Sequence, residues 1–155
     1  MKWKNKGHEF DDVYENLRQK KKFYLFGAGR DGKLVLGVLR KLFGDTIEVA
    51  GYWDNDPQKN GSMYEGLPVT LPQAASDIPR RETGIILSLS LAGSYQLEQQ
   101  LTSLGWKNRE DFCHYYVFLG VFAAYQEQKL YFPSIGFLPT TYCNLNCKAC
   151  LNFTP

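Results

Sequence analysis

Residues 22–32, KFYLFGAGRDG, decide how this chain folds. The first five residues form a compact apolar run, which is typical of a buried strand in a parallel sheet. Three glycines follow in the pattern Gly-x-Gly-x-x-Gly, and the next 12 or so residues repeat apolar side chains at helical spacing (Leu34, Val35, Val38, Leu39 and Leu42). The stretch therefore predicts a buried strand over residues 22–26, a tight glycine turn, and a helix that ends near residue 44.

Each glycine of this turn has a physical reason to be there. Gly27 permits the tight turn, Gly29 lets the backbone approach a diphosphate, and Gly32 allows close packing of helix and strand. The start of the helix, at Arg30, offers free N–H groups and a partial positive charge to an anion. Asp31 in the first helical turn suits the helix dipole but competes with a phosphate for the same N–H groups.

The second strand is expected over residues 47–53, and Asp54 and Asn55 follow it. An acidic residue about 20 positions beyond such a glycine turn commonly accepts a hydrogen bond from a ribose hydroxyl. We therefore predict a ligand site formed by six residues: Gly27, Gly29, Arg30, Gly32, Asp54 and Asn55. The alternative is that the glycines only form a tight turn in a scaffold that has lost its ligand.

The rest of the chain continues the alternation of helices and strands. We expect a leading helix over residues 10–21, a loop over 54–66, and a short strand at 67–69. A short helix over 71–79, a buried strand over 84–89 and a helix that ends at Gly105 follow. A strand near 112–116 and a helix near 118–129 complete the pattern. Alternating strands and helices predict an α/β fold with a mainly parallel sheet and helices on both faces.

The amino-acid composition and net charge limit the partners and the cellular location that we expect for this chain. The chain has 155 residues, of which 44% are hydrophobic and 22% charged, with a net charge of +2. This balance provides a core and no strong field for nucleic acid or anionic membranes, so we expect neither as a partner. No signal peptide or membrane span is evident, which favours a cytoplasmic location. In a reducing compartment, clustered cysteines indicate metal or redox chemistry rather than disulfides.

Two further segments carry a resemblance to known proteins. Residues 26–39, FGAGRDGKLVLGVL, and residues 49–69, VAGYWDNDPQKNGSMYEGLPV, resemble the Rossmann-like domains that precede catalytic domains in glycan pathways. The resemblance covers about residues 20–117, and it implies that a UDP-sugar or a dinucleotide such as NAD lies between the glycine turn and Asp54. An NAD-dependent oxidoreductase domain and a non-catalytic dimerisation scaffold are the alternatives. Tyr125 and Lys129 have the spacing of a dehydrogenase pair, but they lie outside this pattern, and we interpret them as ordinary helix residues.

The C-terminal region contains three closely spaced cysteines: Cys143, Cys147 and Cys150. Their spacing, together with residues 135–147, IGFLPTTYCNLNC, resembles the radical S-adenosylmethionine enzymes. The resemblance implies that the three thiolates hold a [4Fe–4S] cluster and that S-adenosylmethionine occupies the fourth iron. A zinc site, with Cys113 or His114 as the fourth ligand, and no metal at all are the alternatives.

These observations predict three parts. Residues 1–117 form the Rossmann-like nucleotide-binding domain, with residues 1–21 as its leading helix. Residues 118–132 form a connecting helix or linker, and residues 133–155 form the first strand and cluster loop of a radical S-adenosylmethionine barrel. We expect the barrel to be truncated here, so that the parent protein is an enzyme and this fragment is inactive. The aromatic segment 112–137 is expected to pack against the missing barrel, or to promote self-association in its absence.

Overall fold

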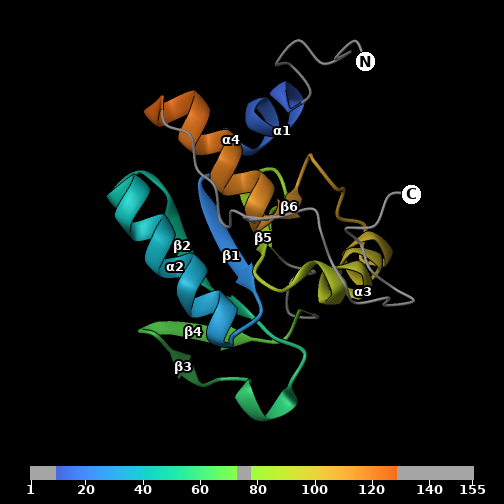
Figure 1. The fold of residues 1–155 in the computed structure, drawn as a ribbon. Helices are drawn as coiled ribbons and strands as arrows, with labels where there is room; N and C mark the ends of the chain where they lie inside the picture. Colours follow the sequence, from blue (N-terminus) through green and yellow to red (C-terminus); the bar gives the residue numbers. More distant parts are fainter. Residues whose placement is uncertain (1–9, 73–77, 129–155) are drawn as a thin grey trace, which may run out of the picture.

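The computed structural model describes residues 10–72 and 78–128 of the chain (Figure 1). Six strands form one sheet: β1 Lys22–Phe26, β2 Glu48–Trp53, β3 Met63–Tyr64, β4 Leu67–Thr70, β5 Thr83–Leu87 and β6 Phe112–His114. The helices are α1 Asp11–Leu17, α2 Arg30–Phe43, α3 Leu91–Ser103 and α4 Tyr115–Glu127, with short 3-10 turns η1 Gly44–Thr46 and η2 Pro57–Lys59. The described part is therefore an α/β domain, as the sequence predicts.

The strand order is β3-β4-β2-β1-β5-β6, and every pairing except β3 with β4 is parallel. The chain moves outward from β1 through β2 to β4, and then returns to the other side of β1 to form β5 and β6. The direction of the strand order therefore reverses between β1 and β5. In open α/β sheets this reversal opens a crevice at the carboxyl ends of the strands. The arrangement is Rossmann-like.

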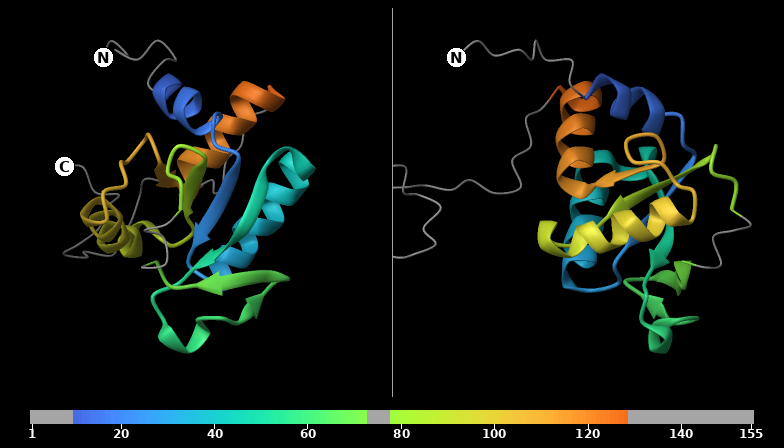
Figure 2. Two further views of the ribbon diagram at one scale, coloured as in Figure 1. Left: turned by 180° about the vertical axis from the view of Figure 1, so that it is seen from behind. Right: turned by 90° about the vertical axis from the view of Figure 1, so that its right-hand side faces the viewer.

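Two apolar clusters hold the layers together. The first joins α1, α2 and α4 to one face of the sheet through buried residues such as Leu17, Leu36 and Phe118. The second joins α3 to the other face through Leu97, Leu101 and residues near the strand ends. Helices thus cover both faces, and the two layers can be followed in Figure 2. Each fully buried side chain of this kind stabilises the fold by about 1.5–3 kcal/mol.

The structure changes three expectations about local elements. The leading helix, expected over residues 10–21, ends at Leu17. Residues 54–66, expected to be a loop, contain η2 and the strand β3, which pairs antiparallel with β4. The strand expected near residues 112–116 ends at His114, because the Nδ1 atom of His114 accepts the Tyr116 N–H and caps α4. Residue 115 therefore begins a helix, not the end of a strand.

The aromatic segment is largely buried in its described part, although Tyr125 is 41% exposed. Phe112, Phe118 and Phe122 are buried, and α4 packs against α1 and α2 within the core of the domain. The expectation that this segment needs a missing barrel as its packing partner is therefore wrong for residues 112–128. None of the helices in residues 10–72 and 78–128 is both long and apolar enough to cross a membrane.

Candidate functional site at the glycine turn

A cavity of about 240 Å³ lies at the carboxyl edge of the sheet, where the strand order reverses. The turn after β1 and the first turn of α2 form one wall, and the segment after β5 forms the other. The lining residues are Gly29, Arg30, Asp31, Gly32, Ser88 and Leu89. Three of the six predicted ligand residues therefore line one cavity: Gly29, Arg30 and Gly32.

The three glycines of the turn differ in what a side chain would meet. Gly27 has a φ of 118°, which only glycine adopts without strain. A Cβ on Gly32 would lie 2.1 Å from the Gly27 carbonyl oxygen, so the helix approaches the turn too closely for any other residue. A Cβ on Gly29 would meet nothing within 4 Å. Gly29 therefore leaves open space beside the backbone, whereas Gly32 leaves none.

The N-terminus of α2 faces this cavity without a side-chain cap. Gly29 is the N-cap residue and has no side chain to bond the first N–H groups of the helix. The Arg30 side chain is 89% exposed, and its Nε lies 3.5 Å from the Asp31 carboxylate. Asp31 thus has a cationic neighbour outside the helix end. The cavity therefore combines backbone N–H groups that no side chain caps with the long cationic side chain of Arg30. Both features suit an anion.

Asp54 lies beside the turn, but most of its hydrogen-bonding capacity is used within the protein. Its Oδ2 accepts from the Ala28 N–H at 2.8 Å and from the Lys59 ammonium at 2.9 Å, and its Oδ1 accepts from the Asp56 N–H at 2.9 Å. Lys59 also donates to the Ala28 carbonyl at 3.0 Å. Because a carboxylate accepts about four hydrogen bonds, Asp54 retains room for about one more. It ties the glycine turn to the end of β2.

These contacts set the charge state of Asp54. Burial alone raises the pKa of the carboxyl group, but the hydrogen bonds from Lys59, Asp56 and Ala28 outweigh burial, so its pKa lies below the ordinary value. Asp54 is therefore ionised at neutral pH and paired with Lys59. Sequence reasoning did not identify Lys59, although its position five residues after Asp54, across a proline-containing turn, was a signal for it.

Asn55 makes a contact that the sequence did not predict. Its Nδ2 donates to the Gln100 Oε1 at 2.8 Å, and the Gln100 Nε2 donates to the Asn55 Oδ1 at 2.9 Å. The two amides therefore form a reciprocal pair between the end of β2 and α3. Neither Asn55 nor Asp54 lines the cavity.

The segment after β5 is anchored by Ser88 and His114. The Ser88 hydroxyl donates to the Phe26 carbonyl at 2.9 Å and lies 3.2 Å from the Gly27 carbonyl. His114 Nδ1 accepts the Tyr116 N–H, so its Nε2 carries the proton and donates to the Leu89 carbonyl at 2.8 Å. Burial lowers the pKa of His114 despite that hydrogen bond. Both residues hold the cavity wall in place.

The described residues do not assemble a metal site. No group of three or more potential ligands (His, Cys, Asp or Glu) comes together in residues 10–72 and 78–128. Cys113 is buried, and burial raises the pKa of its thiol far above its ordinary range. Both ring nitrogens of His114 are engaged in hydrogen bonds. Cys143, Cys147 and Cys150, and Lys129 of the dehydrogenase-like pair, lie outside the described residues.

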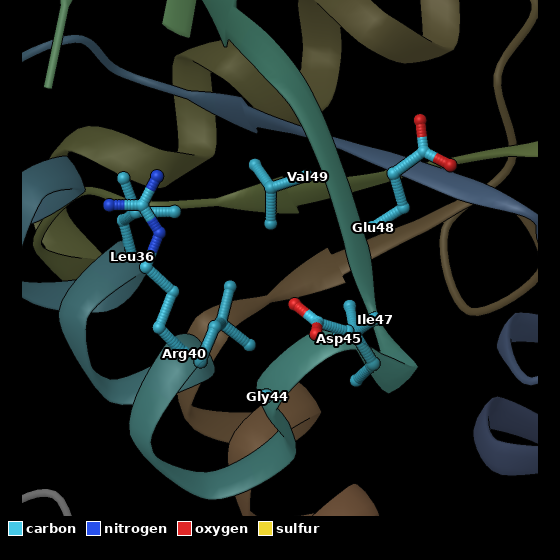
Figure 3. A pocket seen from close by; sticks show the side chains of 8 residues that line it. Leu36, Arg40, Gly44, Asp45, Ile47, Glu48 and Val49 are labelled. Atoms are coloured by element: carbon cyan, nitrogen blue, oxygen red, sulfur yellow. The ribbon is translucent and has the colours of Figure 1, made fainter. Parts of the chain in front are cut away.

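A second cavity, of about 330 Å³, lies at the other end of α2 (Figure 3). It is formed by the last turns of α2, by η1 and by the first residues of β2. Its walls are side chains, mostly apolar ones with charged groups at the rim: Leu36, Leu39, Arg40, Asp45, Ile47, Glu48 and Val49, with Gly44. No predicted ligand residue contributes to it.

Comparison with known proteins gives only distant structural similarity. No protein-family model matches the chain, and no curated protein does. The Rex-family repressor RSP is similar over 67% of this chain, with 18% sequence identity and a TM-score of 0.48. The similarity covers 52% of the RSP chain, so this chain spans about half the length of RSP. RSP in complex with NADH matches with 16% identity and a TM-score of 0.45, over 67% of this chain and 50% of that one.

A UDP-D-quinovosamine 4-dehydrogenase from Vibrio fischeri is similar over 55% of this chain and 72% of its own, with 22% identity and a TM-score of 0.44. Similarities of this size do not show a shared ligand or activity.

Proposed function

We propose that the described domain binds a nucleotide through its phosphates at the glycine turn. The observation that carries this proposal is the cavity at Gly29, where open space adjoins the uncapped N-terminus of α2 at the reversal of the strand order. Backbone N–H groups at a helix start are well suited to a phosphate, because they donate hydrogen bonds and carry a partial positive charge. A diphosphate bridging to a ribose near Asp54 fits this arrangement, as in NAD or a UDP-sugar.

Gly29→Ala tests this proposal with little disturbance of the fold. The backbone at Gly29 is extended, with φ −144° and ψ −168°, so alanine fits there without strain. Its methyl group would occupy the space that we assign to the phosphate. We expect unchanged thermal stability and at least about tenfold weaker binding of pyrophosphate, UDP and NAD by isothermal titration calorimetry, which corresponds to about 1.4 kcal/mol.

Two results would contradict this function. The first is that the wild-type chain binds none of the three compounds at millimolar concentration. The second is that the Gly29→Ala variant binds pyrophosphate as tightly as the wild type does. In contrast, differences between UDP-sugar and NAD affinity would identify the ligand class without affecting the phosphate site.

We further propose that this domain serves as the N-terminal module of a radical S-adenosylmethionine enzyme that modifies a glycan, nucleotide-sugar or peptide. The support is the spacing of Cys143, Cys147 and Cys150, since three thiolates leave one iron of a [4Fe–4S] cluster for S-adenosylmethionine. The test is anaerobic reconstitution with iron and sulfide of a chain long enough to include a barrel. We expect an iron–sulfur absorbance that Cys147→Ala abolishes, whereas zinc alone at this position would refute the proposal.

A further inference from the structure

The carboxyl edge of the sheet has a cavity on one side of β1 and a side-chain bridge on the other. On the side of β5, the cavity reaches Ser88 and Leu89. On the side of β2, the reciprocal amide pair of Asn55 and Gln100 connects the segment after β2 to α3. A nucleotide bound at the switch point of such a sheet extends from the glycine turn toward the acidic residue after the second strand, which is Asp54 here. The amide pair therefore lies on the side where a nucleoside would be placed.

The residues beneath the amide pair show that α3 covers this side of the edge. Leu97 and Leu101 belong to the same buried cluster as Phe26, Trp53 and Leu87, which are the last residues of β1, β2 and β5. Gln100 directly precedes Leu101 and is thus carried on the part of α3 that packs on these strand ends. The amide pair therefore ties the segment after β2 to the helix whose apolar residues share a buried cluster with the strand ends.

Trp53 provides a second, independent observation on this side. It is 0% exposed, and its indole N–H finds no acceptor within the described part of the chain. Buried donors are nearly always hydrogen-bonded, and an unpaired one is unfavourable. Trp53 directly precedes Asp54 and Asn55. Its ring packs against Tyr24 and Trp106, so this donor belongs to the core on the face of the sheet that α3 covers.

We propose that Asn55 and Gln100 form a clasp that closes the nucleoside side of the site, so that Gln100 determines which phosphate compounds enter. This inference rests on the proposed nucleotide-binding function. A phosphate or diphosphate without a nucleoside binds at the glycine turn with the clasp closed. A nucleoside diphosphate needs the clasp open, and its apparent affinity is reduced by the fraction of molecules in which the clasp is open.

Gln100→Ala removes the clasp and leaves the glycine turn intact. Because the pair contains two exposed amide hydrogen bonds, each of modest net strength, we expect the variant to bind UDP roughly three- to tenfold more tightly than the wild type does. Pyrophosphate affinity should stay within about twofold, since pyrophosphate does not reach the clasp. Gln99→Ala is the matched control: it removes the same type of side chain from an exposed neighbouring position, and both affinities should stay unchanged.

The outcomes separate this inference from the function on which it rests. Tighter UDP binding by Gln100→Ala, with pyrophosphate unaffected, supports the clasp. Weaker or unchanged UDP binding overturns the clasp alone, provided that pyrophosphate still binds. An equal gain for UDP and pyrophosphate also overturns it, because the effect would then not depend on the nucleoside. If neither compound binds to any variant, the proposed function and the clasp both fail.

Discussion

The two cavities at opposite ends of α2 differ in what forms their walls. The cavity at the start of the helix is the smaller one, about 240 Å³, and it is bounded largely by the glycine turn and the first helical turn. The cavity at the end of the helix is larger, about 330 Å³, and is bounded by apolar and charged side chains (Figure 3). Volume alone would favour the second cavity as the binding site.

The proposed phosphate site depends on oriented backbone donors, which the smaller cavity has, and not on volume. At the helix start, the turn is held by bonds from Asp54, Lys59 and Ser88, so the N–H groups are already oriented. At the helix end, the dipole is negative and repels an anion. Arg40 there is an exposed cation, and two acidic residues, Asp45 and Glu48, line the same cavity. Ordering such a side chain around a ligand costs entropy.

The largest effect is expected where the helix start meets the turn. Gly32→Ala places a methyl group 2.1 Å from the Gly27 carbonyl oxygen, so the helix and turn must separate. We expect a loss of roughly 3 kcal/mol or more in the free energy of unfolding, measured by urea denaturation. Gly37→Ala is the control in the same helix: its Cβ meets nothing within 4 Å, and a gain of about 0.5–1 kcal/mol is expected. Equal effects at the two positions would show that the close approach is not needed.

A smaller loss in the free energy of unfolding is expected when Asp54, whose carboxylate holds the turn, is replaced. Asp54→Asn leaves Lys59 unpaired and weakens the bonds to the Ala28 and Asp56 N–H groups, which should lower the free energy of unfolding by roughly 1–3 kcal/mol at pH 7. Because the folded pKa of Asp54 lies below its unfolded value, near 3.8, its contribution is complete above that value. It disappears as the pH falls through the folded pKa. Urea titrations from pH 7 to pH 2.5 should show wild type and variant converging in acid.

A constant difference between the two proteins across that pH range would indicate that the ionised carboxylate is not what holds the turn. Asp12 and Glu82 also have lowered pKa values, from bonds to Arg109 and Lys21 respectively, but both remain in the variant. Their contributions therefore cancel in the comparison.

The smallest effect is expected when a single positive charge is removed from either end of α2 and pyrophosphate binding is compared. Arg30→Gln and Arg40→Gln remove the same charge from the same helix, about 15 Å apart along its axis. At physiological salt this distance exceeds the screening length of about 8 Å, so only the nearer charge acts on the glycine turn. We expect Arg30→Gln to weaken pyrophosphate binding about two- to fivefold and Arg40→Gln to change it by less than about twofold. If Arg40→Gln weakens pyrophosphate binding more than Arg30→Gln does, the anion binds in the second cavity and not at the glycine turn.

Much of the fold could be predicted because it depends on local pattern. The strand over residues 22–26 coincides with β1, and the helical stripe after the glycines lies in α2. The expected strand over 47–53 starts one residue before β2, and that over 84–89 overlaps β5. The strand β3 was missed because its two residues, Met63 and Tyr64, are too few to show an alternating pattern. Its pairing with β4 depends on the tight turn through Gly66, which has a φ of 80°.

The candidate site could be predicted only in part, for a related reason. The glycine pattern and Asp54 are visible as spacing along one strand–helix–strand unit. Gln100 and Ser88 lie 45 and 61 residues from their partners Asn55 and Gly27, and no spacing rule connects them. The three cysteines near the C-terminus stay a prediction, since they lie outside the described residues.

The amino-acid sequence by itself determined the alternation of buried strands and amphipathic helices, and the glycine turn that starts α2, because periodicity and backbone freedom are properties of neighbouring residues. The side chains that hold the turn could be identified from the folded structure alone. The fold placed the Lys59 ammonium against the Asp54 carboxylate, and it joined Asn55 to Gln100. Such contacts depend on how the helices and turns pack against the sheet, and packing brings together side chains that are distant in the chain.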